Sequence, residues 1–578
     1  MSGKQQRQIR KEKKGPKKSG QAGNPTTTFA RLHAPCTDSV INTSKAIHLI
    51  GGSGIGANNN SIKASVYGNI FTNNISELVV EENINGAEDN IVELTLPKIY
   101  LNRTLLYFGA TSNGTSTGLQ SFRISNSEGV TLSWSVSDNS AWLSCTPTSG
   151  TGSGSVTASV DPTGLSAGTY TGTITVSDPN ASNSPQTVSV TLNVYNPNQT
   201  SAPFGTFATP TDGSTVRSSI PVTGWVLDDI GVESVKIYRG KINNLIYIGD
   251  AVFIEGARPD VEQAYPGYPN NYQAGWGYMM LTNFLPNHGN GTFKIHAIAA
   301  DSEGHQVTLG IKTITCDNAN AVKPFGAVDT PEQGGLAAGS NYRNQGWVLT
   351  PMPNSIPTDG STINVIVDGF NIGHPTYNVY RKDIATLFPG YANSNGALAY
   401  FDFDTTIYNN GVHTISWNVA DDAGNTDGIG SRYFSIQNTG SRASSRAQES
   451  NVTRFKDLKE FPLDYSLPIG IKKGYRKNTE TVELFSNENG NTNIIIKELG
   501  RVEIHIANLL AGYMKVGNQL NSLPIGSTLD TQRDIYYWQP GPGFIGKYHF
   551  VFILKDQDGN MLRKNVIVDI VPKFSKQE

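Results

Sequence analysis

Short runs of alternating apolar and polar residues occupy most of the chain, and turn residues close each run. Between residues 99 and 196 these runs include TLLYFGA, LSWSVSD, GTYTGTITVSD and QTVSVTLNV. Gly, Asn, Asp, Ser or Pro separates them at intervals of about ten residues, which is the strand spacing of a small sandwich. Alternation with a period of two puts one face of a run in a core and the other in water. The pattern therefore predicts β-sandwiches.

Composition agrees with an all-β chain of several domains. The 578 residues include 60 Gly, 29 Pro and only 6 Met, and charged residues make up 16%, so strong helix formers are scarce. A chain of this length normally forms about four domains, and the apolar residues suffice for several small cores. The three cysteines have no metal-binding spacing, so core packing must hold the sandwiches together. We expect an all-β fold of tandem immunoglobulin-like sandwiches.

The middle of the chain contains an internal repeat. The motif GWVL at Gly224–Leu227 recurs at Gly346–Leu349, and YPGY at Tyr265–Tyr268 is matched by FPGY at Phe388–Tyr391. The motifs Pro-Phe-Gly and Asn-Gly recur as well, with offsets between 120 and 123 residues. Such a constant offset predicts two tandem copies of one sandwich. They resemble bacterial immunoglobulin-like domains, and we place them at residues 202–317 and 322–437.

Residues 99–196 carry motifs in a specific order. The strand LSWSVS contains Trp134, the pair Trp142-Leu143 precedes Pro147, and the segment LSAGTY leads into TGTITVSD. In this order the segment resembles the BACON domain, the Bacteroidetes-associated carbohydrate-binding often N-terminal module. The resemblance implies a sandwich of seven or eight strands, often found beside glycoside hydrolases or proteases in surface proteins. Carbohydrate binding is the role proposed for that family.

The C-terminal part alternates again. Residues 438–464 form a polar stretch that predicts a linker, and residues 465–573 contain the runs VEIHIANL, KYHFVFILKD and NVIVDIVPK. The motif LPIGSTLD followed by YYWQPGPGFIGKYHF resembles the putative-immunoglobulin, cadherin-like domains of bacterial surface proteins. The resemblance implies a further sandwich in this segment.

The N-terminal part differs from the rest. Residues 1–23 hold eight basic residues and one acidic residue, although the whole chain has a net charge of −3. We expect residues 1–29 to be a disordered basic tail, and we favour this over a nucleic-acid contact. Residues 30–98 are β-rich, and GNIFTNN resembles a coil of a parallel β-helix, so the segment is either a β-helix remnant or a hairpin extension.

Five aromatic residues between 265 and 278 are the candidate ligand-binding site. Aromatic rings stack on the apolar faces of sugars while nearby amides bind the hydroxyl groups, which makes this segment a candidate carbohydrate platform. The alternative is a long loop that packs on itself, and the recurrence of YPGY as FPGY favours such a structural role. The candidate residues are Tyr265, Tyr268, Tyr272, Trp276 and Tyr278.

Three turns rich in acids, at residues 301–304, 421–425 and 556–560, are candidate Ca²⁺ sites. Ca²⁺ prefers six to eight oxygen ligands near chain turns, and Asp556 and Asp558 are the best candidates. The alternative is that Asp, Asn and Gly close a hairpin without an ion. We otherwise expect no cofactor.

No constellation for catalysis is recognisable. The nine histidines are scattered, and no GxSxG, zinc or Cys-His pattern occurs. We therefore predict a non-enzymatic, monomeric protein outside the cell or on its surface, which binds carbohydrate or an extracellular protein surface or acts as a spacer. The alternative is the accessory end of a β-helix hydrolase or lyase. No transmembrane run and no secretory signal is visible, so export implies a missing N-terminus or another route.

Overall fold

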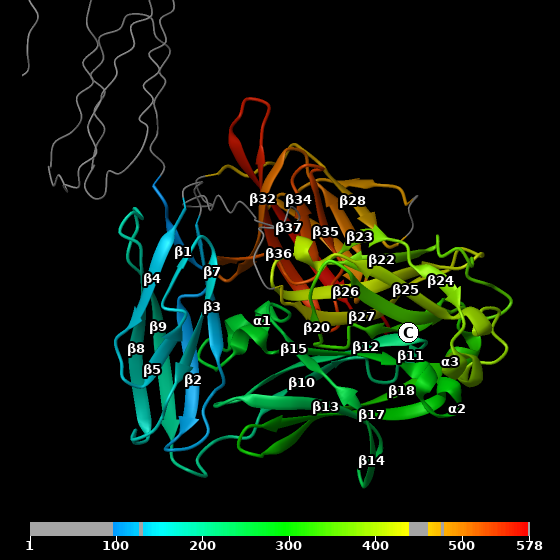
Figure 1. The fold of residues 1–578 in the computed structure, drawn as a ribbon, viewed down its shortest axis with the longest axis horizontal. Coiled ribbons are helices and arrows are strands. Elements are labelled where there is room, and N and C mark those ends of the chain that lie inside the picture. Colours follow the sequence, from blue (N-terminus) through cyan, green and yellow to red (C-terminus); the bar gives the residue numbers. More distant parts are fainter. Residues whose placement is uncertain (1–95, 127–130, 439–460, 476–478, 576–578) are drawn as a thin grey trace, which may run out of the picture. The chain divides into compact units, whose positions relative to one another are not determined.

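The computed structural model describes residues 96–126, 131–438, 461–475 and 479–575 (Figure 1). The predicted basic tail, the β-rich segment up to residue 95 and most of the predicted linker after residue 438 lie outside the described residues. The chain divides into two compact units, residues 1–90 and 91–578, and the description concerns the second. This unit is nearly all β, which confirms the predicted fold class.

Residues 99–195 form a first pair of sheets, here called sandwich 1. One sheet has the order β1-β3-β7-β5, and the other has the order β2-β9-β8-β4-β6, with β2 parallel to β9. Side chains alternate as predicted, and the inward residues include Phe108, Phe122 and Trp134. The strands are β1 (Ile99–Leu101), β2 (Leu105–Thr111), β3 (Gln120–Asn126), β4 (Ser133–Asp138), β5 (Leu143–Thr146), β6 (Ser149–Thr151), β7 (Gly154–Val160), β8 (Gly168–Ser177) and β9 (Gln186–Tyr195).

Residues 204–317 form sandwich 2. Its sheets have the orders β10-β12-β16-β15 and β11-β18-β17-β13-β14, and short helices cover the connections on either side of β16. The strands are β10 (Phe204–Thr209), β11 (Thr215–Val216), β12 (Ser219–Leu227), β13 (Val232–Lys241), β14 (Asn244–Asp250), β15 (Val252–Ile254), β16 (Gly275–Leu281), β17 (Asn290–Asp301) and β18 (Gln306–Asp317); the helices are α1 (Pro259–Ala264), η1 (Asn271–Gln273), η2 (Thr282–Phe284), α2 (Pro286–Gly289) and η3 (Asn318–Asn320).

Residues 325–436 form sandwich 3, which has the same strand order as sandwich 2. Its sheets run β19-β21-β25-β24 and β20-β27-β26-β22-β23, so each strand has a counterpart in sandwich 2 and the predicted tandem repeat is confirmed. The strands are β19 (Phe325–Thr330), β20 (Leu336–Ala337), β21 (Tyr342–Leu349), β22 (Ile363–Val367), β23 (Phe370–Gly373), β24 (Thr376–Val379), β25 (Leu398–Phe403), β26 (Gly411–Ala420) and β27 (Thr426–Ile436); the helices are α3 (Lys382–Leu387), η4 (Ser394–Gly396) and η5 (Thr405–Ile407).

Residues 469–571 form sandwich 4. Its sheets have the orders β29-β28-β31-β35-β34 and β30-β37-β36-β32-β33, and its core is rich in aromatic rings around Trp538. The strands are β28 (Ile469–Lys473), β29 (Val482–Leu484), β30 (Asn491–Lys497), β31 (Val502–His505), β32 (Leu509–Val516), β33 (Gln519–Asn521), β34 (Ser527–Asp530), β35 (Ile535–Trp538), β36 (Gly546–Lys555) and β37 (Met561–Val571).

Sandwich 4 packs against both copies of the repeat. Its core is continuous with Ile254 and Ala257 of sandwich 2 and with Tyr433 of sandwich 3. The Tyr433 hydroxyl donates a hydrogen bond of 3.0 Å to the carbonyl oxygen of Pro542. On the other side, a Cβ atom added to Gly277 would lie 2.2 Å from the carbonyl group of Pro542, so only glycine fits there. The loop that carries Pro542 is therefore held between the two copies.

A buried polar contact lies in the same junction. The Glu498 carboxylate, in the turn after β30, accepts a hydrogen bond of 2.7 Å from the Thr209 hydroxyl of sandwich 2. It also accepts one of 3.1 Å from the backbone N–H of Lys573. The Lys573 ammonium in turn forms an ion pair of 3.1 Å with Asp427 of sandwich 3. These contacts join residues of three sandwiches.

Candidate functional site

The repeated motifs of sandwich 2 meet in one aromatic cluster. Phe204 of the first motif, Trp225 of GWVL, and Tyr265 and Tyr268 of YPGY have ring centroids 5.2–5.9 Å apart. Such edge and tilted contacts are the favoured arrangements of aromatic pairs. The cluster packs α1 and the following loop onto the sheet through Val261. Tyr265 and Tyr268 are half-buried, and their packing against Phe204 and Trp225 fixes this loop to the sheet.

Sandwich 3 contains the same cluster at the corresponding positions. The ring of Phe388 stacks on Trp347 at 5.4 Å, and Phe325 contacts both Phe388 (5.5 Å) and Tyr391 (5.3 Å). The ring of Phe284, from sandwich 2, contacts Trp347 at 6.0 Å. The recurring YPGY and FPGY motifs therefore hold a helix and loop against each sheet, and the second cluster also touches the preceding sandwich.

Tyr272 lies at the junction between sandwiches 1 and 2. The guanidinium group of Arg103 lies 3.5 Å from the centre of its ring and forms an ion pair of 2.7 Å with Glu255. A cation over an aromatic face is attracted to the ring. Burial raises the pKa of Tyr272 to about 12. The ring thus takes part in an interdomain contact.

Trp276 and Tyr278 lie on a different face from Tyr265 and Tyr268. Both project from β16 toward the core of sandwich 2, since residues two apart share a face of a strand. Trp276 is fully buried and packs against Phe207 at 5.9 Å, so it cannot meet a ligand. Tyr278 is half-buried at the edge of the core, and burial raises its pKa. The structure therefore does not bring the five predicted rings onto one surface.

The predicted acidic pair lies at the tip of the hairpin between β36 and β37. The Asp556 carboxylate accepts hydrogen bonds from the backbone N–H groups of Asp558 (3.0 Å) and Asn560 (2.7 Å) and from the Asn560 side chain (3.0 Å). These bonds lower the pKa of Asp556. Asp558 is exposed and Asp556 is half-buried. The turn thus satisfies Asp556 with its own donors, as the hairpin alternative predicts.

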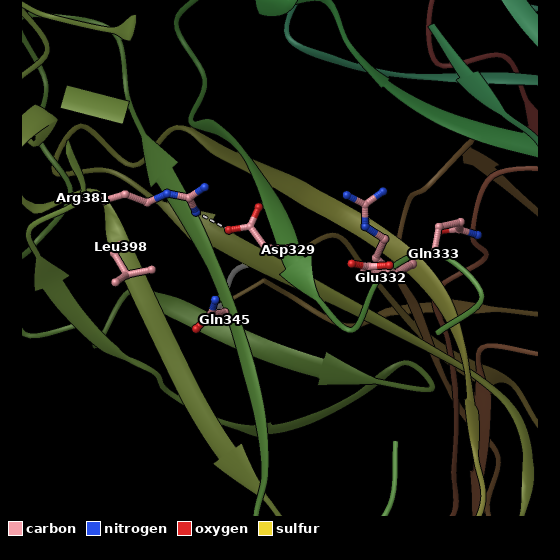
Figure 2. A pocket seen from close by; sticks show the side chains of 7 residues that line it. Asp329, Glu332, Gln333, Gln345, Arg381 and Leu398 are labelled. Atoms are coloured by element: carbon pink, nitrogen blue, oxygen red, sulfur yellow. Dashed lines mark hydrogen bonds and ion pairs between the residues drawn. The ribbon is translucent and has the colours of Figure 1, made fainter. Parts of the chain in front are cut away.

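An open polar pocket of about 730 Å³ lies on sandwich 3 (Figure 2). Strands β19, β21, β25 and β27 and the turn after β19 supply most of its side chains. It is lined by Asp329, Glu332, Gln333, Gln345, Arg381, Leu398 and Arg432. No aromatic ring is among them, so stacking on a sugar ring is not a property of this pocket.

Both arginines of the pocket are held by acceptors of the protein. Arg381 forms an ion pair with Asp329 and another, of 2.9 Å, with Asp383. The pKa of Asp329 is nevertheless raised, because burial outweighs the arginine. Arg432 donates two hydrogen bonds, of 3.0 and 2.8 Å, to the carbonyl oxygen of Val328, and burial lowers its pKa. The arginines are thus fixed by the protein.

Two lining side chains are not engaged in this way. The side-chain amide of Gln345, half-buried in β21, and the exposed carboxylate of Glu332 have no hydrogen-bond partner among the described residues. Together they offer both donors and acceptors to a ligand. Sequence reasoning missed this pocket because its residues come from five separate segments that share no motif. The sequence signal that points to the pocket is the alternation of polar residues along the strands of the second copy.

No helix among the described residues is long and apolar enough to cross a membrane. The two cysteines of the described part, Cys145 and Cys316, are free, in agreement with sandwiches held by core packing.

Two protein families match parts of the chain. Residues 99–195 match the family described as the viral BACON domain, and residues 203–255 match the bacterial Ig domain. No curated protein sequence matches the chain.

Solved structures of similar sandwiches were also found. Fibronectin(III)-like modules of CbhA from Clostridium thermocellum match at 14% identity and a TM-score of 0.14, covering 41% of this chain and 95% of that one. The insect immune protein hemolin matches at 10% identity and 0.18, covering 82% and 100%. A Bacteroides ovatus GH5 xyloglucanase matches at 18% identity and 0.15, covering 22% and 27%. These low scores carry no argument about function. The chain is a multidomain β protein in which a sandwich that matches the BACON family precedes sandwiches of the immunoglobulin type.

Proposed function

We propose that this non-catalytic modular protein is displayed outside the cell and binds a glycan or a protein surface through the pocket of sandwich 3. The observation that carries the proposal is a pair of polar side chains, Gln345 and Glu332, that have no hydrogen-bond partner among the described residues and lie in an open pocket whose arginines are already fixed. A preorganised polar site with free donors and acceptors suits a ligand rich in hydroxyl groups.

A comparison of the two copies supports this choice. In sandwich 2 the equivalent part of the sheet, which includes Thr209 and Thr223, is covered by Glu498 of sandwich 4. Position 345 of sandwich 3 corresponds to Thr223, since each residue directly precedes the GWVL motif. The same sheet surface is thus used for an internal contact in one copy and left open in the other. In sandwich 3 this surface is open to solvent, and we propose that an external partner binds there.

The experiment is a glycan array probed with the full chain, followed by calorimetric titration of any ligand found. We expect Gln345→Ala and Glu332→Ala to lower the affinity about tenfold, because each removes one hydrogen bond to the ligand. Glu488→Ala, an exposed glutamate in sandwich 4, is the matched control and should bind as the unaltered chain does. An array on which no glycan binds would reject the glycan part of the proposal. Binding that survives both substitutions would reject the pocket.

We propose the domain boundaries given above, a monomeric chain, and a location outside the cell. We include a virion beside a bacterial cell as the displaying surface, because the family matched by residues 99–195 is described as viral. Among the five aromatic residues, only Tyr265 and Tyr268 are kept as a second contact for a sugar, and Tyr268→Ala tests them in the same titration.

A further inference from the structure

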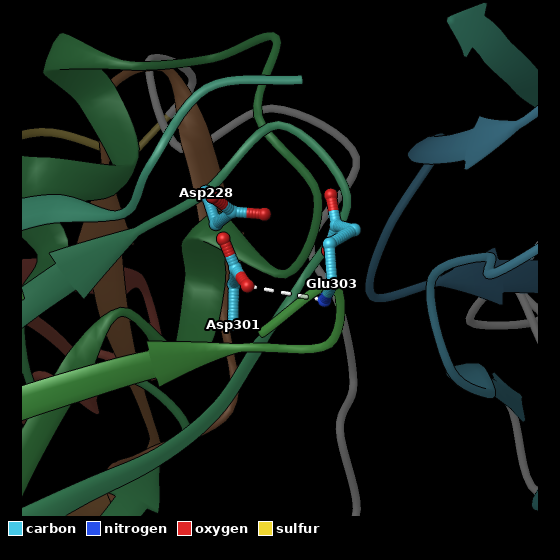
Figure 3. Close-up of side chains that lie close together, drawn as sticks. All are labelled: Asp228, Asp301 and Glu303. Carbon is cyan, nitrogen blue, oxygen red and sulfur yellow. Dashed lines mark hydrogen bonds between the residues drawn. The ribbon is translucent and has the colours of Figure 1, made fainter. Parts of the chain in front are cut away.

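Three acidic side chains meet at one end of sandwich 2 (Figure 3). Asp228 follows the GWVL motif at the end of β12, and Asp301 and Glu303 lie in the turn between β17 and β18. One oxygen atom from each carboxylate lies within 4.8 Å of the others. Asp228 is 2% exposed and Asp301 is fully buried, so two of the three charges are removed from water.

Two of these carboxylates have an oxygen with no protein donor. The Oδ2 atom of Asp228 accepts hydrogen bonds from the backbone N–H groups of Ile230 (2.9 Å) and Gly231 (2.8 Å), but its buried Oδ1 atom has no partner. The buried Oε1 atom of Glu303 has none either. Figure 3 shows the Asp228 carboxylate directed toward the other two acids. A buried carboxylate oxygen without a donor is costly, and so is a cluster of like charges, unless a cation binds.

The charges of the surroundings do not cancel the cluster. Among the described residues, the basic group in contact with the cluster is His305, which forms a hydrogen bond of 2.7 Å between its Nδ1 atom and Asp301 and whose side chain is 42% exposed. Asp229, next in the chain, adds a further carboxylate nearby. Burial and these neighbouring carboxylates raise the pKa values of Asp228 and Glu303. Acidic side chains thus outnumber basic ones around the cluster.

Sandwich 3 has mostly neutral side chains at the same position. Its residues at the three positions are Thr350, Asp421 and Ala423, so two of the three acids are absent. The Thr350 hydroxyl donates to Asp421 at 2.9 Å, and the Asn425 side chain donates to the same carboxylate at 3.0 Å. In the second copy neutral donors satisfy the one remaining acid. The contrast indicates that the acids of sandwich 2 are not required by the fold.

We propose that Asp228, Asp301 and Glu303 bind a calcium ion that braces the junction between sandwich 1 and sandwich 2. Ca²⁺ binds carboxylate oxygens at 2.3–2.6 Å, so ligands of one ion lie at most about 5 Å apart, in agreement with the observed separation. All donors are oxygen, which favours a hard cation over zinc or copper. Ca²⁺ also tolerates irregular geometry better than Mg²⁺. Backbone carbonyls or waters would complete the coordination.

The loop that carries Asp228 also holds sandwich 1. The Thr117 hydroxyl donates a hydrogen bond of 2.5 Å to the carbonyl oxygen of Ile230. The backbone N–H of Ser201, in the segment between the sandwiches, donates to Asp229 at 2.8 Å. A Cβ atom added to Gly109 would lie 1.9 Å from the carbonyl oxygen of Asp229, so the two backbones are in close contact. An ion that fixes this loop therefore fixes the junction.

The test is calorimetric titration of Ca²⁺ into the full chain after treatment with EDTA, with Mg²⁺ as a comparison. We expect binding with a Kd of about 10⁻⁴–10⁻³ M, the range of extracellular modules. Asp228→Asn keeps an oxygen that accepts from Ile230 and Gly231 but removes the charge. This variant should bind one Ca²⁺ fewer per chain, or bind Ca²⁺ at least tenfold more weakly. Asp422→Asn, which removes one exposed charge from the matching turn of sandwich 3, should bind as the unaltered chain does.

Stability measurements separate loss of the ion from loss of the fold. Without Ca²⁺, Asp228→Asn should melt at or above the unaltered chain, because it relieves repulsion between acids. With Ca²⁺, the unaltered chain and Asp422→Asn, but not Asp228→Asn, should gain stability and resist protease cleavage in residues 196–203. If Asp228→Asn proves unstable without the ion, Glu303→Ala is the deciding variant in the same measurements, because alanine occupies this position in sandwich 3. Equal Ca²⁺ binding by the unaltered chain and the deciding variant, or no binding at all, would overturn the proposal.

Discussion

Glu498 makes the stability of the junction between sandwiches 2 and 4 depend on pH. Its side chain is 3% exposed, and burial raises its pKa to about 7 from an ordinary value of 4.5. The folded protein therefore holds the proton more tightly than the unfolded chain. Below pH 4.5 both states are protonated and no stability is lost. Stability falls as the pH rises from about 4.5 to 7, because ionisation then favours the unfolded chain.

The size of the effect follows from the two pKa values. The difference between about 7 and 4.5 corresponds to a decrease of about 3 kcal/mol in the free energy of unfolding. This decrease is complete by about pH 8. Glu498→Gln removes the ionisation and keeps an oxygen that accepts from Thr209. We expect the variant to match the unaltered chain at pH 4.5 and to exceed it by about 3 kcal/mol at pH 8.

Urea denaturation followed by tryptophan fluorescence at several pH values measures the difference. For a slope of about 3 kcal/mol per M, the urea midpoints should separate by about 1 M at pH 8 and coincide at pH 4.5. Glu488→Gln, at an exposed position of the same sandwich, should follow the unaltered chain at every pH. Midpoints of the Glu498→Gln variant that run parallel to those of the unaltered chain would refute the reasoning.

Three further substitutions test other contacts. Gly277→Ala should separate sandwich 4 from sandwich 2, because its Cβ atom would lie 2.2 Å from the Pro542 carbonyl group; faster hydrogen exchange in β16 would reveal it, and unchanged exchange would contradict it. Phe388→Ala should cost about 3–5 kcal/mol, because it removes a buried ring from the cluster of sandwich 3; an unchanged melting temperature would speak against this. Arg103→Lys keeps the charge but loses the planar stack on Tyr272, which should weaken that junction by about 1 kcal/mol and speed protease cleavage in residues 196–203.

The sandwiches and the repeat could be predicted because they depend on local patterns. Alternation with a period of two identifies strands and their buried face, and GWVL recurring at Gly224 and Gly346 marks equivalent strands, β12 and β21. Each prediction uses residues that are neighbours in the chain or that are compared at a fixed offset. Neither step needs knowledge of how the sandwiches pack.

The aromatic segment shows where proximity in sequence misleads. Tyr265 and Tyr268 pack on the outer face of a sheet, whereas Trp276 and Tyr278 turn toward its inner face, because the chain passes from the covering loop into β16 between them. Residues ten positions apart therefore end on opposite sides of one sheet. The face that each ring takes is decided by pairing of β16 with β12, which the local sequence does not encode.

The pocket and the acidic cluster depend on contacts between distant segments. Glu498 and Thr209 are 289 positions apart, and Asp228 meets Asp301 only because β12 and β17 end at the same side of sandwich 2. Acidic turns occur in three sandwiches, so a turn motif alone cannot separate a cation site from a closed hairpin. The third acid of the cluster, Asp228, lies outside the turn motif at residues 301–304. A position-by-position comparison of the copies, Asp228 against Thr350, identifies it.

The two copies of the repeat share a fold but differ in side chains both inside and outside the core. Their strand orders and aromatic clusters are the same, yet Trp276 in the core of sandwich 2 corresponds to Ala399, and Trp417 in the core of sandwich 3 corresponds to Ala297. Two of the differences lie at contact surfaces: Asp228, beside the junction with sandwich 1, corresponds to Thr350, and Thr223, beneath Glu498 of sandwich 4, corresponds to Gln345 of the open pocket. At each of these two places the changed residue accompanies a changed contact, whereas the exchanged tryptophans keep a buried ring in each core. A difference between the copies therefore supports a proposed site only together with such a contact, as it does for Asp228 and Gln345.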